Sequence, residues 1–202
     1  MTQSQLQEQL RSLRLGHFAQ ALLQQQSQAT TYDEMSFEER LGLLAQHEIH
    51  CRQDSKVKRL LRQATLRLEA HASRLEYRAE RGLRKDKVAT LLSGQYLHHA
   101  HNIIVTGATG CGKTYFACAL ARQACEQHHT VRYYRLGQLL DELNIGHADG
   151  SYRQQLAQLA KKKLLILDDW GMEKLSARQA NDLLDVMEER YQNTSTIIAS
   201  QL

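Results

Sequence analysis

Eight consecutive residues are the strongest candidates for chemistry in this chain: Gly107, Ala108, Thr109, Gly110, Cys111, Gly112, Lys113 and Thr114. They match G-x-x-x-x-G-K-[ST], the spacing of a loop that binds nucleotide phosphates. The glycines let the backbone close around a polyphosphate and turn several N–H groups inward. Lys113 would reach the β- and γ-phosphates as a catalytic group, and the Thr114 hydroxyl would ligate Mg²⁺. We therefore expect the chain to bind ATP or a similar triphosphate together with Mg²⁺.

The residues on either side of the loop favour a genuine phosphate-binding loop over a chance match in a glycine-rich turn. Residues 102–106 include the β-branched run Ile103, Ile104 and Val105, which predicts a buried strand. Residues 115–121 are rich in small side chains and predict a helix. A helix that begins at the loop directs the positive end of its dipole at bound phosphate.

A pair of carboxylates, Asp168 and Asp169, follows the apolar run Leu164–Leu167. In open parallel sheets ligands lie at the carboxyl ends of strands, so we expect this pair beside the phosphate-binding loop. Asp168 would then hold Mg²⁺ through water, and Asp169 would orient or deprotonate the water that attacks the γ-phosphate. Turn formation or helix capping is the alternative for two aspartates after a strand. The phosphate-binding loop earlier in the chain favours the magnesium interpretation.

Ser200 and Gln201 follow the last apolar run of the sequence. Two interpretations stay open for them. Their side chains touch the γ-phosphate or the attacking water, which makes Gln201 a catalytic candidate, or they bond the backbone at the end of a strand.

The elements that would position these residues alternate regularly after about residue 95. Predicted strands alternate with predicted helices, which indicates a parallel α/β sheet. The strands are expected at 102–106, 131–135, 164–167 and 196–199, and the helices at 115–128, 138–145, 151–161 and 176–191, with a turn at 146–150. Residues 96–202 therefore predict an ATP-binding domain whose sheet is flanked by helices.

Residues 1–95 predict an all-helical region for DNA binding or oligomerisation. Leucines at helical spacing indicate two short amphipathic helices up to about residue 31, interrupted at Gly16. Ser36 and Glu39 have the spacing of a capping box, after which a long helix is expected to run to about Leu68.

Positive charge is concentrated in this helical region. The chain carries a net charge of +4, but residues 52–87 hold 12 Lys or Arg against 5 Asp or Glu, which is +7 and leaves −3 for the rest. Arg52, Lys56 and Arg59 fall on one helical face. Two interpretations stay open: a solvated face with local ion pairs, or a surface that binds the phosphate backbone of double-stranded DNA. Because Tyr77 is the single Phe, Tyr or Trp of this segment, contact with DNA would be largely independent of sequence.

Composition disfavours membrane and secreted classes. The sequence has no apolar run that approaches the roughly 18 residues of a membrane span. Residues 1–5 lack the basic-then-apolar pattern of a signal peptide. The four cysteines, at 51, 111, 118 and 125, do not have the spacing of metal ligands, so we expect reduced thiols in a cytoplasmic protein.

Four stretches together resemble a known family: SFEERLGLL at 36–44, GATGCGKT at 107–114 with ACALA at 117–121, LLILDDWG at 164–171, and TIIASQL at 196–202. They are similar to the IstB-like transposition helper ATPases, which are AAA+ proteins close to the DnaC helicase loaders. The Asp-Asp-Trp-Gly sequence and the Ser-Gln pair are more specific to this family than the phosphate-binding loop alone.

The resemblance implies an AAA+-type fold and an ATP-dependent, DNA-binding oligomer that helps a partner transposase capture target DNA. It also implies that Asp169 is the second acid of the Walker B motif and that Ser200 and Gln201 occupy the sensor-1 position. The family's arginine finger and C-terminal helical lid have no matching position in the sequence up to Leu202. Because an arginine finger contributes a factor of about 10³ or more in phosphoryl transfer, we expect the chain as given to bind Mg·ATP but hydrolyse it poorly, unless the natural protein is longer.

Three other functions use the same residues. A helicase loader or replication initiator would share the fold, although the Asp-Asp-Trp-Gly sequence favours a transposition helper. A nucleotide-gated DNA-binding module would use ATP to switch oligomerisation without efficient turnover. A small-molecule kinase would need an acceptor pocket, and it would have no use for the basic helical region.

Overall fold

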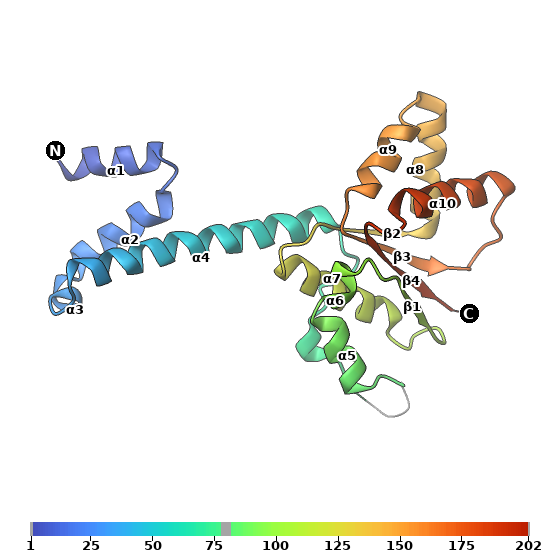
Figure 1. The fold of residues 1–202 in the computed structure, drawn as a ribbon, viewed down its shortest axis with the longest axis horizontal. Helices are drawn as coiled ribbons and strands as arrows, with labels where there is room; N and C mark the ends of the chain where they lie inside the picture. The colour runs from blue at the N-terminus through green and yellow to red at the C-terminus, as the bar shows by residue number, and fades with distance from the viewer. Residues whose placement is uncertain (1, 78–81, 202) are drawn as a thin grey trace. The chain divides into compact units, whose positions relative to one another are not determined.

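A computed structural model describes residues 2–77 and 82–201, which fold into two compact units, one up to Lys58 and one from Arg59 onward. Figure 1 shows the ribbon with its helices and strands labelled. The expected functional division near residue 95 stays a prediction. In chain order the described elements are α1 (Gln3–Ser12), α2 (Gly16–Ser27), α3 (Ala29–Tyr32), α4 (Phe37–Ala64), the short 3₁₀ helix η1 (Ala72–Arg74), α5 (Lys85–Leu92), α6 (Gln95–His98), β1 (Ile103–Thr106), α7 (Lys113–Glu126), β2 (Val131–Arg135), α8 (Leu136–Asp149), α9 (Tyr152–Ala160), β3 (Leu164–Trp170), α10 (Ala177–Arg190) and β4 (Ser195–Ser200).

The first unit contains α1, α2, α3 and most of α4. The predicted capping box is confirmed at the start of α4, where the Glu39 N–H donates to Ser36 Oγ (3.2 Å) and the Ser36 N–H donates to Glu39 Oε2 (2.7 Å). Within this unit the buried Glu48 of α4 accepts hydrogen bonds from the Phe18 N–H (2.7 Å) and from Arg52 Nε (2.6 Å). Glu48 therefore joins α4 to the first turn of α2, whose N–H groups need a partner.

We expect Glu48→Gln to loosen α2 at neutral pH. Burial by itself raises the pKa of Glu48, but the Phe18 N–H and Arg52 more than offset it, so the pKa lies below its ordinary value. A carboxylate with a lowered pKa stabilises the fold above its unfolded-state pKa, and that contribution is lost as the pH falls through the folded-state value. Loss of its charge-assisted hydrogen bonds should cost about 1–3 kcal/mol of local stability at pH 7.

Hydrogen exchange of the α2 amides, corrected for the intrinsic pH dependence of exchange, measures this effect. The wild type should lose its advantage over Glu48→Gln as the pH falls below about 4. Asp54→Asn, which neutralises an exposed carboxylate on the same helix, is the matched control and should leave α2 unchanged. Equal protection of α2 in all three proteins at pH 7 would contradict this role of Glu48.

Among the described residues, the second unit is built on a sheet of four parallel strands in the order β1-β4-β3-β2. The predicted alternation of strands and helices is therefore confirmed. Strand β3 runs to Trp170 rather than ending at Leu167, so both aspartates lie within the strand. Helix α8 ends at Asp149 rather than 145, so Gly146 lies inside the helix and not in the expected turn. A Cβ at Gly146 would come within 2.7 Å of Gln155 Oε1. Gly150, at φ +82°, ends the helix in the left-handed conformation.

Apolar side chains cover both faces of this sheet. One cluster joins α7 to one face, and another joins α8, α9 and α10 to the other. Figure 1 shows the ribbons of these helices and of the sheet. Leu60 and Ala64 of α4 belong to the α7 cluster, so the end of this helix packs in the second unit. Helix α4 ends at Ala64 rather than Leu68 because Thr65 adopts a positive φ of +50°, outside the helical region.

Candidate nucleotide-binding site

The loop at 107–112 connects β1 to α7 and matches the backbone of a phosphate-binding loop. Gly110 and Gly112 have φ values of +79° and +94°, which a side chain at these positions would disfavour. Helix α7 begins directly after Gly112, and no described side chain caps its first N–H groups. Those N–H groups, together with the helix dipole, form a ready site for a phosphate.

The Lys113 amine lies against the carbonyl groups of the loop. Its Nζ donates to the Gly107 carbonyl (2.6 Å) and to the Ala108 carbonyl (2.8 Å). The cation is therefore already within the loop where a triphosphate would bind, and its bonds to neutral carbonyls can be exchanged for stronger ones to phosphate oxygens.

The structure brings Thr114 and Asp168 together. Thr114 Oγ1 donates to Asp168 Oδ2 at 2.7 Å, which joins the start of α7 to β3. The same oxygen accepts a hydrogen bond from the Tyr133 hydroxyl at 2.7 Å, and Oδ1 accepts one from the Asp169 N–H at 2.9 Å. Asp168 is only 2% exposed, so these donors replace the water that a buried carboxylate would otherwise need.

Asp169 faces two arginines. Its Oδ2 accepts from Arg135 Nε at 2.7 Å and from Arg67 Nη1 at 3.4 Å. A β-bulge explains this direction: Leu167 pairs with Ile198 and Trp170 with Ser200, so two residues of β3 oppose one of β4. Asp169 itself has a φ of +58°, which aspartate tolerates better than most residues.

Sequence reasoning did not identify Tyr133, Arg67 or Arg135 as site residues. Tyr133 and Arg135 lie in β2, and Arg67 follows α4, so none of them belongs to a motif. The one usable signal was the rule that parallel strands end at the same edge, which also applies to β2. Burial and the hydrogen bond to Asp168 raise the pKa of Tyr133, and the nearby Tyr133 phenol raises the pKa of Arg67.

Ser200 and Gln201 have different hydrogen-bond partners, so each of the two interpretations fits one of these residues. Ser200 Oγ donates to the Trp170 carbonyl at 3.0 Å, so it bonds the backbone of the neighbouring strand. Gln201 Oε1 accepts from Thr109 Oγ1 at 2.7 Å, which brings this side chain to the phosphate-binding loop. The catalytic role of Gln201 stays a prediction.

The three residues predicted to contact DNA differ in their surroundings. The Arg52 guanidinium donates to Glu48 and to the Arg14 carbonyl, so it is committed to contacts within the first unit. Lys56 and Arg59 are exposed on α4.

The oxygen donors at this site fit Mg²⁺. Mg²⁺ in nucleotide sites is held by one or two protein groups together with phosphate oxygens and waters. The Thr114 hydroxyl and the Asp168 carboxylate supply such a set. In residues 2–77 and 82–201 there is no group of three or more His, Cys, Asp or Glu side chains that could hold a metal by themselves.

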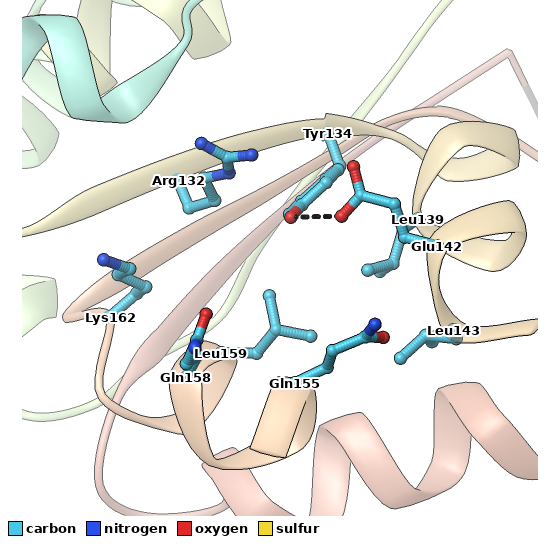
Figure 2. Close-up of a pocket in the computed structure, with 9 residues that line it drawn as sticks. All are labelled: Arg132, Tyr134, Leu139, Glu142, Leu143, Gln155, Gln158, Leu159 and Lys162. Atoms are coloured by element: carbon cyan, nitrogen blue, oxygen red, sulfur yellow. Dashed lines mark hydrogen bonds between the residues drawn. The ribbon is translucent and has the colours of Figure 1, made fainter. Parts of the chain in front are cut away.

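A separate cavity of about 350 Å³ lies between β2, α8 and α9. Figure 2 shows the Tyr134 hydroxyl donating to Glu142 (2.8 Å), with Arg132 and Lys162 on one side of the cavity. Tyr134 packs in the α8–α10 cluster and Tyr133 in the α7 cluster, so the two tyrosines face opposite sides of the sheet.

Among the described residues, no helix combines the length and apolarity needed to cross a membrane.

The sheet, the loop between β1 and α7, and the carboxylate on β3 define a P-loop nucleotide-binding fold. Residues 8–202 match the family model described as IstB-like ATP binding protein, and the chain belongs to this family.

Individual relatives agree with the family match. The chain is 45% identical to the ATP-binding protein named for insertion sequence IS1162 of Pseudomonas fluorescens, over 100% of this chain and 87% of the relative.

Solved structures with low sequence identity share the fold. The DnaC helicase loader has a TM-score of 0.58 at 20% identity, covering 72% of this chain and 80% of that one. AMPPCP-bound DnaA from Aquifex aeolicus has a TM-score of 0.61 at 18% identity, covering 68% and 44%. The second unit therefore has the fold of AAA+ P-loop ATPases.

Proposed function

We propose that this chain is an ATP-dependent helper of DNA transposition, which oligomerises on double-stranded DNA and delivers it to a partner transposase. The observation that carries the proposal is the Thr114–Asp168 hydrogen bond beside the phosphate-binding loop, in a chain similar to an insertion-sequence ATP-binding protein. In this proposal residues 96–202 bind ATP, and residues 1–95 bind DNA or a neighbouring subunit.

Nucleotide binding follows from the groups at the loop. The N–H groups of 107–114 would surround the β-phosphate, and Lys113 would exchange the Gly107 and Ala108 carbonyls for β- and γ-phosphate oxygens. Thr114 and Asp168 would hold Mg²⁺, which neutralises charge on the phosphates. Gln201, on Thr109, would lie where it can contact the γ-phosphate or a water molecule.

The contacts of Asp169 favour a second candidate, a nucleotide-gated module with little turnover. Two guanidinium groups hold this carboxylate and compete for the lone pair that would accept a proton from water. Efficient hydrolysis would require Asp169 to leave Arg135 and Arg67. The fold shared with the DnaC helicase loader supports a loader-like function as the other alternative.

DNA binding is best tested on α4, where Lys56 and Arg59 are exposed. We expect Lys56→Glu/Arg59→Glu to weaken binding to duplexes of different sequence by a similar factor. If each residue neutralises one phosphate, the slope of log K against log salt should decrease in magnitude by about 2. ATP affinity should not change. Fluorescence anisotropy of labelled duplexes over a salt series, with and without Mg·ATP, measures both quantities.

A matched variant separates specific contacts from net charge. Lys174→Glu/Arg178→Glu makes the same charge change at two exposed positions in or before α10. An equal loss in both double variants would indicate a non-specific charge effect. Wild-type binding that does not depend on Mg·ATP would contradict nucleotide-controlled assembly, and an absence of duplex binding would remove the proposed function.

A further inference from the structure

Tyr133 is a buried phenol in direct contact with the carboxylate at the nucleotide site. It is 5% exposed, lies in the middle of β2, and pairs in register with Ile166 of β3. Its hydroxyl donates to Asp168 Oδ2 at 2.7 Å. A buried hydroxyl without a partner is costly, so the phenol stays bonded to Asp168, and this bond constrains the carboxylate.

The hydrogen bonds around Asp168 determine the direction of its carboxylate. Oδ1 accepts from the Asp169 N–H, and Oδ2 accepts from both Thr114 and Tyr133. When the Thr114 oxygen binds a cation through its lone pairs, its proton can still be donated to Asp168. Tyr133 and the Asp169 N–H are the donors to Asp168 that are not themselves groups proposed to hold the cation.

Arg67 reinforces the donor role of the phenol. Its Nη1 lies 3.8 Å from Asp168 Oδ2. A guanidinium has donors but no acceptor, so the acceptor for the Tyr133 proton is the Asp168 carboxylate.

We propose that Tyr133 is the positioning residue of the magnesium site: it holds the Asp168 carboxylate in the orientation that accepts the nucleotide-bound cation. This inference rests on the proposed binding of Mg·ATP by Thr114 and Asp168. Groups that orient a metal ligand from behind typically affect metal affinity by about 10- to 100-fold. The effect should therefore appear in the requirement for Mg²⁺, and nucleotide affinity without Mg²⁺ should not change.

Tyr133→Phe and Tyr134→Phe form a matched pair. Each removes one hydroxyl and preserves the ring, and each hydroxyl donates to one carboxylate, Asp168 for Tyr133 and Glu142 for Tyr134. Tyr134 lies in the separate cavity of Figure 2, on the other face of the sheet. The probe is methylanthraniloyl-labelled ATP, whose binding is titrated with MgCl₂ and measured again in EDTA.

We expect Tyr133→Phe to raise the Mg²⁺ midpoint by about 10-fold or more, with wild-type affinity in EDTA and a thermal unfolding midpoint close to that of the wild type. Tyr134→Phe should keep the wild-type Mg²⁺ midpoint. An unchanged midpoint in Tyr133→Phe, or an equal increase in both variants, would overturn the inference and leave the proposed function standing. If Mg²⁺ does not affect nucleotide binding by the wild type, or if Asp168→Asn keeps the wild-type Mg²⁺ midpoint, both the magnesium part of the proposed function and this inference are wrong.

Discussion

Lys113→Ala should lower the affinity for ATP by about 100-fold, because charge-assisted hydrogen bonds contribute about 1.5–3 kcal/mol each. The amine already lies within the loop, against the Gly107 and Ala108 carbonyls. The substitution removes this cation and leaves the N–H groups of the loop in place. Weak binding should therefore remain, while any ATP hydrolysis, with or without duplex DNA, should be lost.

Isothermal titration with ATP and a steady-state phosphate-release assay measure the two effects. Lys174→Ala, at an exposed position before α10, is the control for loss of a positive charge and should behave as wild type. Wild-type affinity in Lys113→Ala would contradict the assignment of the loop. DNA-stimulated turnover in the wild type that is lost in Lys113→Ala would support an ATPase. ATP-dependent DNA binding without turnover would instead support the nucleotide-gated module.

Arg190→Met should lower the free energy of unfolding of the second unit by about 3 kcal/mol or more, because buried acceptors lose charged donors. Arg190 is 2% exposed at the end of α10. Its guanidinium donates to the carbonyls of Leu159 (2.6 Å), in the last turn of α9, and of Lys162 (2.9 Å), just after it. It also donates to the Ser195 carbonyl and to Thr196 Oγ1 at the start of β4. The side chain therefore connects three elements, and methionine can fill its volume but cannot satisfy these oxygens.

The effect of Arg190→Met should not depend on pH between about 6 and 8. Burial lowers the pKa of Arg190 to about 10, below its ordinary value, so the folded state releases this proton only in alkaline solution. For a base with a lowered pKa, stability changes with pH only between the folded and unfolded values. Urea unfolding at two pH values measures this, with Arg178→Met, at an exposed position on the same helix, as the control. A loss below about 1 kcal/mol would contradict the structural role of Arg190, since that is the ordinary range of exposed substitutions.

The sequence alone predicted the fold class, the loop from Gly107 to Thr114, and the proximity of Asp168 to that loop. The spacing of Gly107 to Thr114 determines a local backbone structure, so a single motif was enough to predict it. The alternation of strands and helices predicted a parallel sheet, and the structure confirms it. The proximity of Thr114 and Asp168 followed from one general property of parallel sheets, because the ends of their strands meet at one edge.

The partners of each side chain could not be predicted in the same way. Arg52 was grouped with Lys56 and Arg59 because helical spacing identifies a shared face, but periodicity does not show that Glu48 and the Arg14 carbonyl occupy its guanidinium. Similarly, Gly146 was expected in a turn, although its lack of a side chain serves the contact between α8 and α9. In both cases the deciding contact is with a residue outside the local pattern.

The sequence by itself determined that this chain has a phosphate-binding loop and a carboxylate beside it. Only the tertiary structure decided how the carboxylates are held. A bulge in β3 directs Asp169 to Arg135 and Arg67, and the register of β2 against β3 brings Tyr133 to Asp168. The physical reason is that a motif requires only neighbouring residues to adopt a conformation, whereas these contacts depend on strand register and on a chain segment about 100 residues away, as the separation of 102 between Arg67 and Asp169 shows.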